Sequence, residues 1–341
     1  MKRIRKARIA FLFISLIFFP FAVSAQMVEG LYQTKVFLND RSTAELNRGF
    51  SEALVKVLIK LTGQSEISSN LPWVRTLIDG AESFIERYSF EPVSEPKVGL
   101  NLLATFDKKI LIQELKTLEI RQWGSVRPTI SFEIAKKQED SISLDNSDPT
   151  YYETINRKAI ERGLPVVFSE SRNVQPNVGY SSEFYVSNQN RYPGSVEFSI
   201  NTGVNNVTEV NAVLWFLKET QEFNFIETDS ENAVRRLVDL VVDHVAKTIL
   251  SNVRETKTQD VVLEFFNIKS RQEFERLLAY LSALEQIDKV FVKSIEATSL
   301  KLEIFVKGGL KGFEQCVLYS EVIRRTSNRN PLQYNFLDKG K

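Results

Sequence analysis

The clearest pattern in the sequence is the order of strand and helix signals near its end. Alternating apolar residues predict strands over residues 261–267, 289–296, 300–307 and 333–336. Apolar residues at helical spacing predict helices over 271–284 and 310–324. The order β-α-β-β-α-β is typical of a ferredoxin-like domain, in which two helices cover one face of a four-stranded antiparallel sheet. We therefore expect a ferredoxin-like domain over residues 260–341.

A similar order of elements appears after residue 25. Strand signals lie at 28–38, 83–90 and 98–106, and helix signals at 42–63, 71–78 and 108–118. The resulting order, β-α-α-β-β-α, comes close to that of the last domain. We expect an N-terminal α+β domain over 26–127, also ferredoxin-like.

The helix that begins after Ser42 is the most regular in this first domain. Ser42 and Glu45 have the S-x-x-E spacing of a capping box, and Gly63 stands where a left-handed residue would end the helix. Its apolar residues recur at steps of three and four, which predicts one buried face. Lys56 and Lys60, with Glu52, are expected on the opposite, solvated face.

The central part of the chain predicts a mixed sheet. A strand at 129–135, a helix at 151–162 that stops at Gly163, and a strand at 164–168 form a β-α-β unit with parallel strands. Three meandering strands and a long closing helix, 231–250, follow. We expect a middle domain over 128–252, so that the whole chain is an α+β protein of three small domains.

The first 25 residues have the composition of a secretory signal peptide. Five basic residues precede the apolar run 9–23, and the small residues Ser24 and Ala25 form a cleavage site. A retained membrane anchor is the alternative, but Pro20 leaves an apolar run shorter than the roughly 20 residues of a spanning helix. We expect residues 1–25 to be a cleaved signal peptide and the protein to reside in the periplasm, with no stable membrane span after cleavage.

Export affects how the net charge and the single cysteine of the chain are interpreted. The chain has a net charge of +1, and removal of the five signal-peptide cations leaves 39 Lys and Arg against 43 Asp and Glu. This balance gives no basic field for nucleic acid. Cys316 alone cannot form an internal disulfide, and its apolar helical setting predicts a buried structural thiol.

Several short segments together resemble one known family. They are Val28-Glu29-Gly30, residues 42–63, Trp123-Gly124 with Arg127-Pro128, and Gly163-Leu164-Pro165. With the terminal βαββαβ pattern they resemble the domain-of-unknown-function 2066 family, exported proteins of two-membrane bacteria. The resemblance covers most of the chain after residue 25 but not residues 171–192. It implies periplasmic residence and a role in the cell envelope, and it carries no site residues because that family has no established catalytic residues.

The sequence shows no credible catalytic or metal-binding set. His244 is the only histidine and lies beside the apolar row of the closing helix, which favours packing over a catalytic role. One His and one Cys cannot supply the ligands of a usual zinc site. The Asp residues of the loop 136–150 lack the spacing of a calcium-binding loop. We expect no cofactor, no metal and no catalytic residue.

The long polar loop at 171–193 is the candidate for partner binding. It carries four aromatic side chains that could make adaptable contacts: Tyr180, Phe184, Tyr185 and Tyr192. A loop packed onto its own domain is the alternative.

Three functions remain open from the sequence. The first is a non-catalytic periplasmic protein that binds envelope proteins or the cell wall as an assembly or accessory factor. The second is a carboxylate-based hydrolase that acts on envelope carbohydrate or peptide, because carboxylate pairs are formed only by folding. The third is a small-ligand sensor that uses a crevice between domains. The sequence does not determine the oligomeric state.

Overall fold

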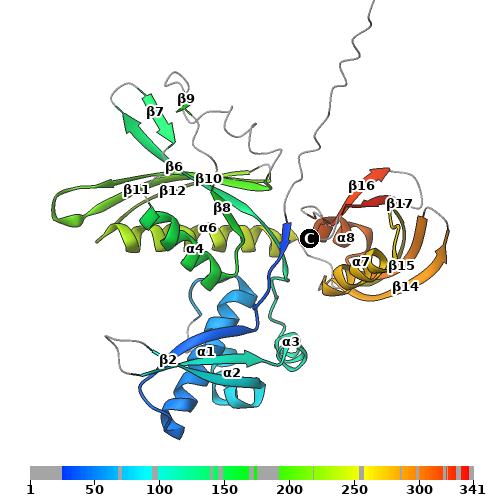
Figure 1. The fold of residues 1–341 in the computed structure, drawn as a ribbon, viewed down its shortest axis with the longest axis horizontal. Helices are drawn as coiled ribbons and strands as arrows, with labels where there is room; N and C mark the ends of the chain where they lie inside the picture. Colours follow the sequence, from blue (N-terminus) through cyan, green and yellow to red (C-terminus); the bar gives the residue numbers. More distant parts are fainter. Residues whose placement is uncertain are drawn as a thin grey trace, which may run out of the picture.

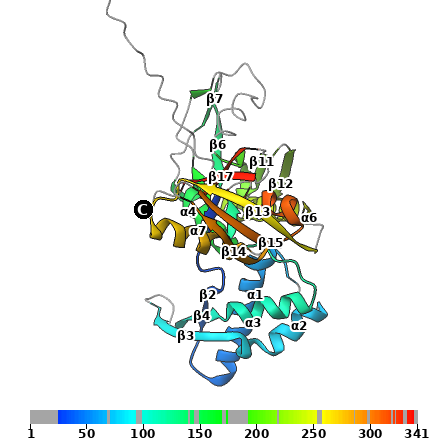
Figure 2. The same ribbon diagram turned by 90° about the vertical axis from the view of Figure 1, so that its right-hand side faces the viewer.

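The computed structural model describes residues 25–67, 71–93, 99–138, 141–144, 149–168, 173–174, 192–217, 219–252, 257–284, 286–296, 299–317, 320, 322–327 and 332–337. It contains three separate hydrophobic cores, one in each part of the chain. Figures 1 and 2 show the first domain below the other two, with the last domain beside the middle one. The expected α+β architecture of several domains is confirmed.

The first domain is a three-stranded antiparallel sheet packed against helices. Its elements are β2 (Gln33–Leu38), α1 (Thr43–Thr62), α2 (Pro72–Asp79), β3 (Ile85–Pro92), β4 (Leu100–Phe106) and α3 (Lys108–Thr117). The strand order is β2-β4-β3, so β2 lies at one edge. No fourth strand closes this sheet among the described residues, because the chain leaves α3 through the short strand β5 (Val126–Pro128), which pairs with β1 (Ala25–Met27).

Helix α1 has the expected ends, but only half of the expected capping box. The Ser42 hydroxyl accepts a hydrogen bond from the backbone N–H of Glu45 at 3.3 Å. The Glu45 carboxylate instead accepts from the backbone N–H of Asn39 at 2.9 Å and from Arg48. Gly63 ends the helix with φ 72°, the left-handed conformation that favours glycine.

The middle domain is a seven-stranded mixed sheet with two helices on one face. Its main elements are β6 (Ile130–Gln138), β7 (Ser141–Leu144), α4 (Pro149–Arg162), β8 (Val166–Phe168), β9 (Asn173–Val174), β10 (Gly194–Thr202), β11 (Thr208–Phe216), β12 (Glu219–Glu227) and α6 (Ser230–Asn252). The strand order is β12-β11-β10-β6-β7-β9, with β8 also beside β6. Strands β6 and β8 are parallel, which confirms the β-α-β unit through α4. Figure 1 shows α4 and α6 on the same side of the sheet.

The last domain contains five strands, one more than the ferredoxin-like pattern. Its elements are β13 (Thr258–Phe266), α7 (Arg271–Ala283), β14 (Ile287–Ile295), β15 (Ser299–Lys307), α8 (Gly309–Val317), β16 (Ile323–Ser327) and β17 (Leu332–Phe336), in the order β14-β15-β13-β17-β16. Strand β17 is parallel to β13, whereas the other pairs in this sheet are antiparallel.

The extra strand replaces part of an expected helix. The helix predicted over 310–324 ends at Val317, and residues 323–327 form β16. The Ser320 hydroxyl accepts hydrogen bonds from the backbone N–H groups of Val322 and Ile323, each at 3.1 Å, which turns the chain. Ile323 is then buried in the core from a strand rather than from a helix.

Strand β5 lies where the three domains meet. Val126 packs against the core of the last domain, while Arg127 reaches the first and middle domains. The Ser125 hydroxyl donates to the carbonyl oxygen of Ala283 in α7 at 3.3 Å. Within the described residues, no helix has both the length and the apolar character needed to cross a membrane.

Candidate functional site

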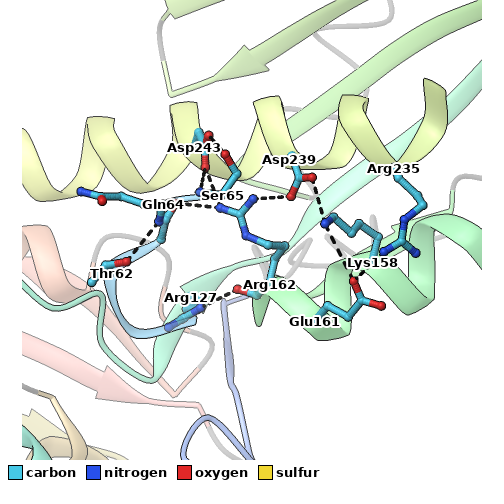
Figure 3. Close-up of polar contacts among 11 residues, drawn as sticks. Thr62, Gln64, Ser65, Arg127, Lys158, Glu161, Arg162, Arg235, Asp239 and Asp243 are labelled. Carbon is cyan, nitrogen blue, oxygen red and sulfur yellow. Dashed lines mark hydrogen bonds and ion pairs between the residues drawn. The ribbon is translucent and has the colours of Figure 1, made fainter. Parts of the chain in front are cut away.

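The first and middle domains are joined through a buried arginine at the end of α4. Arg162, 1% exposed, forms ion pairs with Asp239 and Asp243 on α6. Its Nη2 atom also donates to the carbonyl oxygen of Gly63 at 2.8 Å. Ser65 completes the contact, because its backbone N–H and hydroxyl donate to the two carboxylate oxygens of Asp243 at 2.8 and 2.7 Å. Figure 3 shows how these side chains bind the end of α1 to α4 and α6.

A second buried arginine holds the same junction from the side of β5. The Arg127 guanidinium donates to five backbone carbonyl oxygens, those of Lys60, Trp123, Gly124, Arg162 and Gly163, at 2.7 to 3.1 Å. It also lies 4.1 Å from the centre of the Trp123 ring. Because these carbonyl groups come from α1, the segment before β5 and the end of α4, the side chain fixes all three relative to one another.

A groove of about 1190 Å³ opens beside this junction, between the first and middle domains. Its first-domain wall comes from residues 28–35 and α1, and its middle-domain wall from α4 and residues 163–165. Seven basic residues line it: Lys35, Lys56, Lys60, Arg157, Lys158, Arg162 and Arg235. Only two acidic residues, Glu29 and Glu161, do so. The groove therefore favours an anionic ligand.

Lys60 is, with Arg162, one of two buried cations that line this groove. Only 9% of the residue is exposed, and its Nζ atom donates to the carbonyl oxygens of Gln33 at 2.8 Å and Gly30 at 3.3 Å. Among the described residues it has no ion-pair partner. Burial, and then the nearby charge of Arg127, lower the pKa of Lys60 to about 8, although Glu161 acts in the opposite direction.

The other basic residues at the rim already have acidic neighbours. The ion pairs are Lys35–Glu91 at 2.6 Å, Lys56–Glu52 at 2.9 Å, Arg157–Glu231 at 2.5 Å, Lys158–Asp239 at 2.9 Å and Arg235–Glu161 at 3.0 Å. At least one side chain of each pair is partly exposed to solvent, so such pairs contribute about 0–1 kcal/mol and can exchange partners.

The predicted binding loop is largely outside the described part of the chain. Tyr180, Phe184 and Tyr185 lie outside the described residues, so their prediction stays untested. Tyr192 is described and half-buried, and it does not line the groove.

His244 and Cys316 have surroundings typical of packing residues. His244 lies half-buried on α6 and packs edge-on against Phe223, with ring centres 6.5 Å apart. Burial lowers the pKa of His244, and Glu219 opposes this shift. The Cys316 thiol donates to the carbonyl oxygen of Gly312 on the same helix at 2.9 Å. The described residues contain no cluster of metal-binding side chains.

The fold also brings together two buried carboxylates that the sequence could not reveal as a pair. Glu133 on β6 and Glu197 on β10 stand directly opposite each other on neighbouring parallel strands, and both are buried. Burial, and then the charge of Glu133, raise the pKa of Glu197. Neither residue lines the groove.

Lys60 lies on the buried side of α1 and not on the solvated face predicted from the sequence, so that prediction was wrong. Glu52 and Lys56 form the expected surface pair, but Lys60 turns under β2 and is buried. A signal was present, because Lys60 lies three residues after Val57 and next to Leu61, both in the core. The segments that carry the family resemblance also meet here, since 28–30, 163–165 and the end of α1 line the groove.

Comparison with family models gives a match that lies within the first domain. A family described as a domain of unknown function (DUF8605) matches residues 25–124, which run from β1 to the Gly124 that Arg127 contacts. No curated protein matches the chain. The resemblance to the domain-of-unknown-function 2066 family therefore stays a prediction.

Proposed function

We propose that this chain is an exported, non-catalytic accessory protein of the cell envelope that binds another envelope protein in the groove between its first two domains. The observation that carries the proposal is the groove itself, in which seven basic residues and two acidic residues face a volume of about 1190 Å³. That volume lies above the roughly 300–1,000 Å³ typical of small-molecule sites. A segment of a protein with several acidic side chains suits it better than a small ligand.

The groove also limits how a partner can bind. Strand β2 borders it with a free edge, but the outward carbonyl oxygens of that edge already accept hydrogen bonds from α1. Lys60 donates to Gln33 and Lys56 to Lys35, at 2.8 and 3.3 Å. Such protection disfavours the addition of a further strand. The partner therefore binds through side chains rather than by extending the sheet.

Photo-crosslinking in intact cells tests this function. Ile160 lines the groove and is 72% exposed, so a photoreactive residue at this position should form an adduct with the partner. Ile226, 63% exposed on the edge strand β12 and outside the groove, is the matched control. An adduct with an envelope protein at position 160 but not at 226 supports the proposal. Equal adducts at both positions, none at 160, or adducts only with cell-wall material would overturn it.

A hydrolase is the second candidate, and the carboxylate pair of Glu133 and Glu197 favours it. The backbones of adjacent strands are about 5 Å apart, so the register of Glu133 and Glu197 is compatible with the close carboxyl pair of a retaining glycosidase. It ranks second because both side chains are buried and neither lines the groove. Release of sugar or peptide from purified cell wall by the wild-type protein, abolished in Glu197→Gln, would place this candidate first.

A further inference from the structure

We infer that Lys60 is the specificity-determining anchor of the groove, and that its ammonium group binds a carboxylate of the acidic partner segment. This inference rests on the proposed function and adds the chemical group that the groove selects. An ammonium group has three hydrogen-bond donors, and two of them reach the carbonyl oxygens of Gly30 and Gln33. The third donor has no acceptor among the described residues.

The position of this cation points to a ligand rather than to structural stability. Gly30 and Gln33 themselves line the groove, so the ammonium group that contacts both lies at its wall. A buried cation without a counter-ion is unfavourable, and a bound anion would supply the missing charge. The other lining cations form ion pairs with carboxylates. Lys60 is therefore the lining cation that has no ion-pair partner among the described residues.

A carboxylate fits the surroundings of Lys60 better than a phosphate. The charged groups that act on Lys60 are Arg127, Glu161 and Lys56. The Arg127 guanidinium already donates hydrogen bonds to backbone carbonyl oxygens, and Lys56 forms an ion pair with Glu52. The site thus offers one free donor, which suits a singly charged carboxylate, whereas a phosphate needs several donors or an arginine fork.

Calorimetric titration of the purified protein with short poly-L-glutamate tests this assignment. Non-specific attraction to a polyanion is weak, because the chain after residue 25 has 39 Lys and Arg against 43 Asp and Glu. We expect poly-L-glutamate to bind, poly-L-glutamine not to bind, and polyphosphate of equal charge to bind more weakly. Lys60→Met should weaken poly-L-glutamate binding about tenfold or more. Lys56→Met, at an exposed pair of the same groove, should change it by less than about threefold.

Proton uptake by Lys60 on ligand binding gives a second test, because a lysine with a purely structural role would take up no proton. Near pH 8 about half of the Lys60 side chains are neutral, and a bound carboxylate would protonate them. Titrations in buffers of different ionisation enthalpy should therefore show uptake of about half a proton in the wild type and none in Lys60→Met. Lys60→Gln, which keeps a donor without the charge, replaces the Met variant if the latter does not fold.

The outcomes separate this inference from the proposed function. Absence of poly-L-glutamate binding, stronger binding of polyphosphate, or equal affinity and proton uptake in the Lys60 variant would each overturn the carboxylate anchor. The crosslink from position 160 in the wild type would still be expected in those cases, because the other basic residues of the groove could bind the partner.

Discussion

Lys60 carries a positive charge at a site where the fold disfavours it. Its pKa is about 8 in the folded protein, below the usual 10.5, because burial penalises the charged form. The unfolded chain therefore binds more protons between pH 8 and 10.5, so Lys60 opposes folding fully below pH 8. This penalty is lost as the pH rises through that window.

The stability of Lys60→Met tests this charge penalty. The variant should be more stable than the wild type at pH 7, and the difference should shrink by about 2 kcal/mol at pH 10. Urea unfolding at both pH values measures it, with the exposed Lys109→Met as control. A difference between the variant and the wild type that does not change with pH would contradict the buried-charge assignment.

Two glycines with the same backbone conformation allow a matched test of the junction. Gly30 and Gly63 have φ angles of 68° and 72°. A Cβ atom at Gly63 would lie 2.3 Å from the Cβ of Ala246 on α6, whereas one at Gly30 would meet nothing within 4 Å. Gly30→Ala should cost about 1–2 kcal/mol from backbone strain alone, and Gly63→Ala about 2 kcal/mol more because the domains must separate. Equal losses in thermal unfolding would show that Gly63 does not pack tightly against α6.

Helix α1 shows what an element can reveal through its sequence. Its span, its Ser42 cap and its Gly63 end follow from local propensity and spacing, and all were predicted. The burial of Lys60 depends on where β2 passes over the helix. The spacing of apolar residues in α1 does not predict this tertiary contact. Likewise the close packing of Gly63 is against Ala246 on α6, a helix that begins only at Ser230.

The end of the chain shows where prediction from the sequence fails. The stretch 310–324 keeps a helical spacing of apolar residues, yet α8 ends at Val317 and Ile323 enters the core from β16. Short apolar runs fit both the helical and the strand periodicity, so the spacing of apolar residues could not distinguish a helix from a strand here. The carboxylate pair Glu133 and Glu197 was equally hidden, because only the register between β6 and β10 brings the two residues together.

At the scale of the whole molecule, the arginines at the junction decide whether the first two domains move as one. Arg162 is buried between Asp239 and Asp243, and its loss leaves these carboxylates without their main cation. Arg162→Met should cost about 3–5 kcal/mol and split thermal unfolding into two steps. Arg235→Met, which breaks only the partly exposed pair with Glu161, should cost less than about 1 kcal/mol. Calorimetry that shows one cooperative transition in both variants would contradict a coupling role for Arg162.

The walls of the groove include the side chain of Lys60, the end of α1 and the junction between the first two domains. The most direct measurement of its role is the yield of the in-cell crosslink from position 160 in the wild type and in Lys60→Met. We expect an adduct with one acidic envelope protein, and we expect its yield to fall at least about tenfold when Lys60 is replaced. An adduct whose yield is the same in both backgrounds would contradict the claim that Lys60 anchors the partner in this groove.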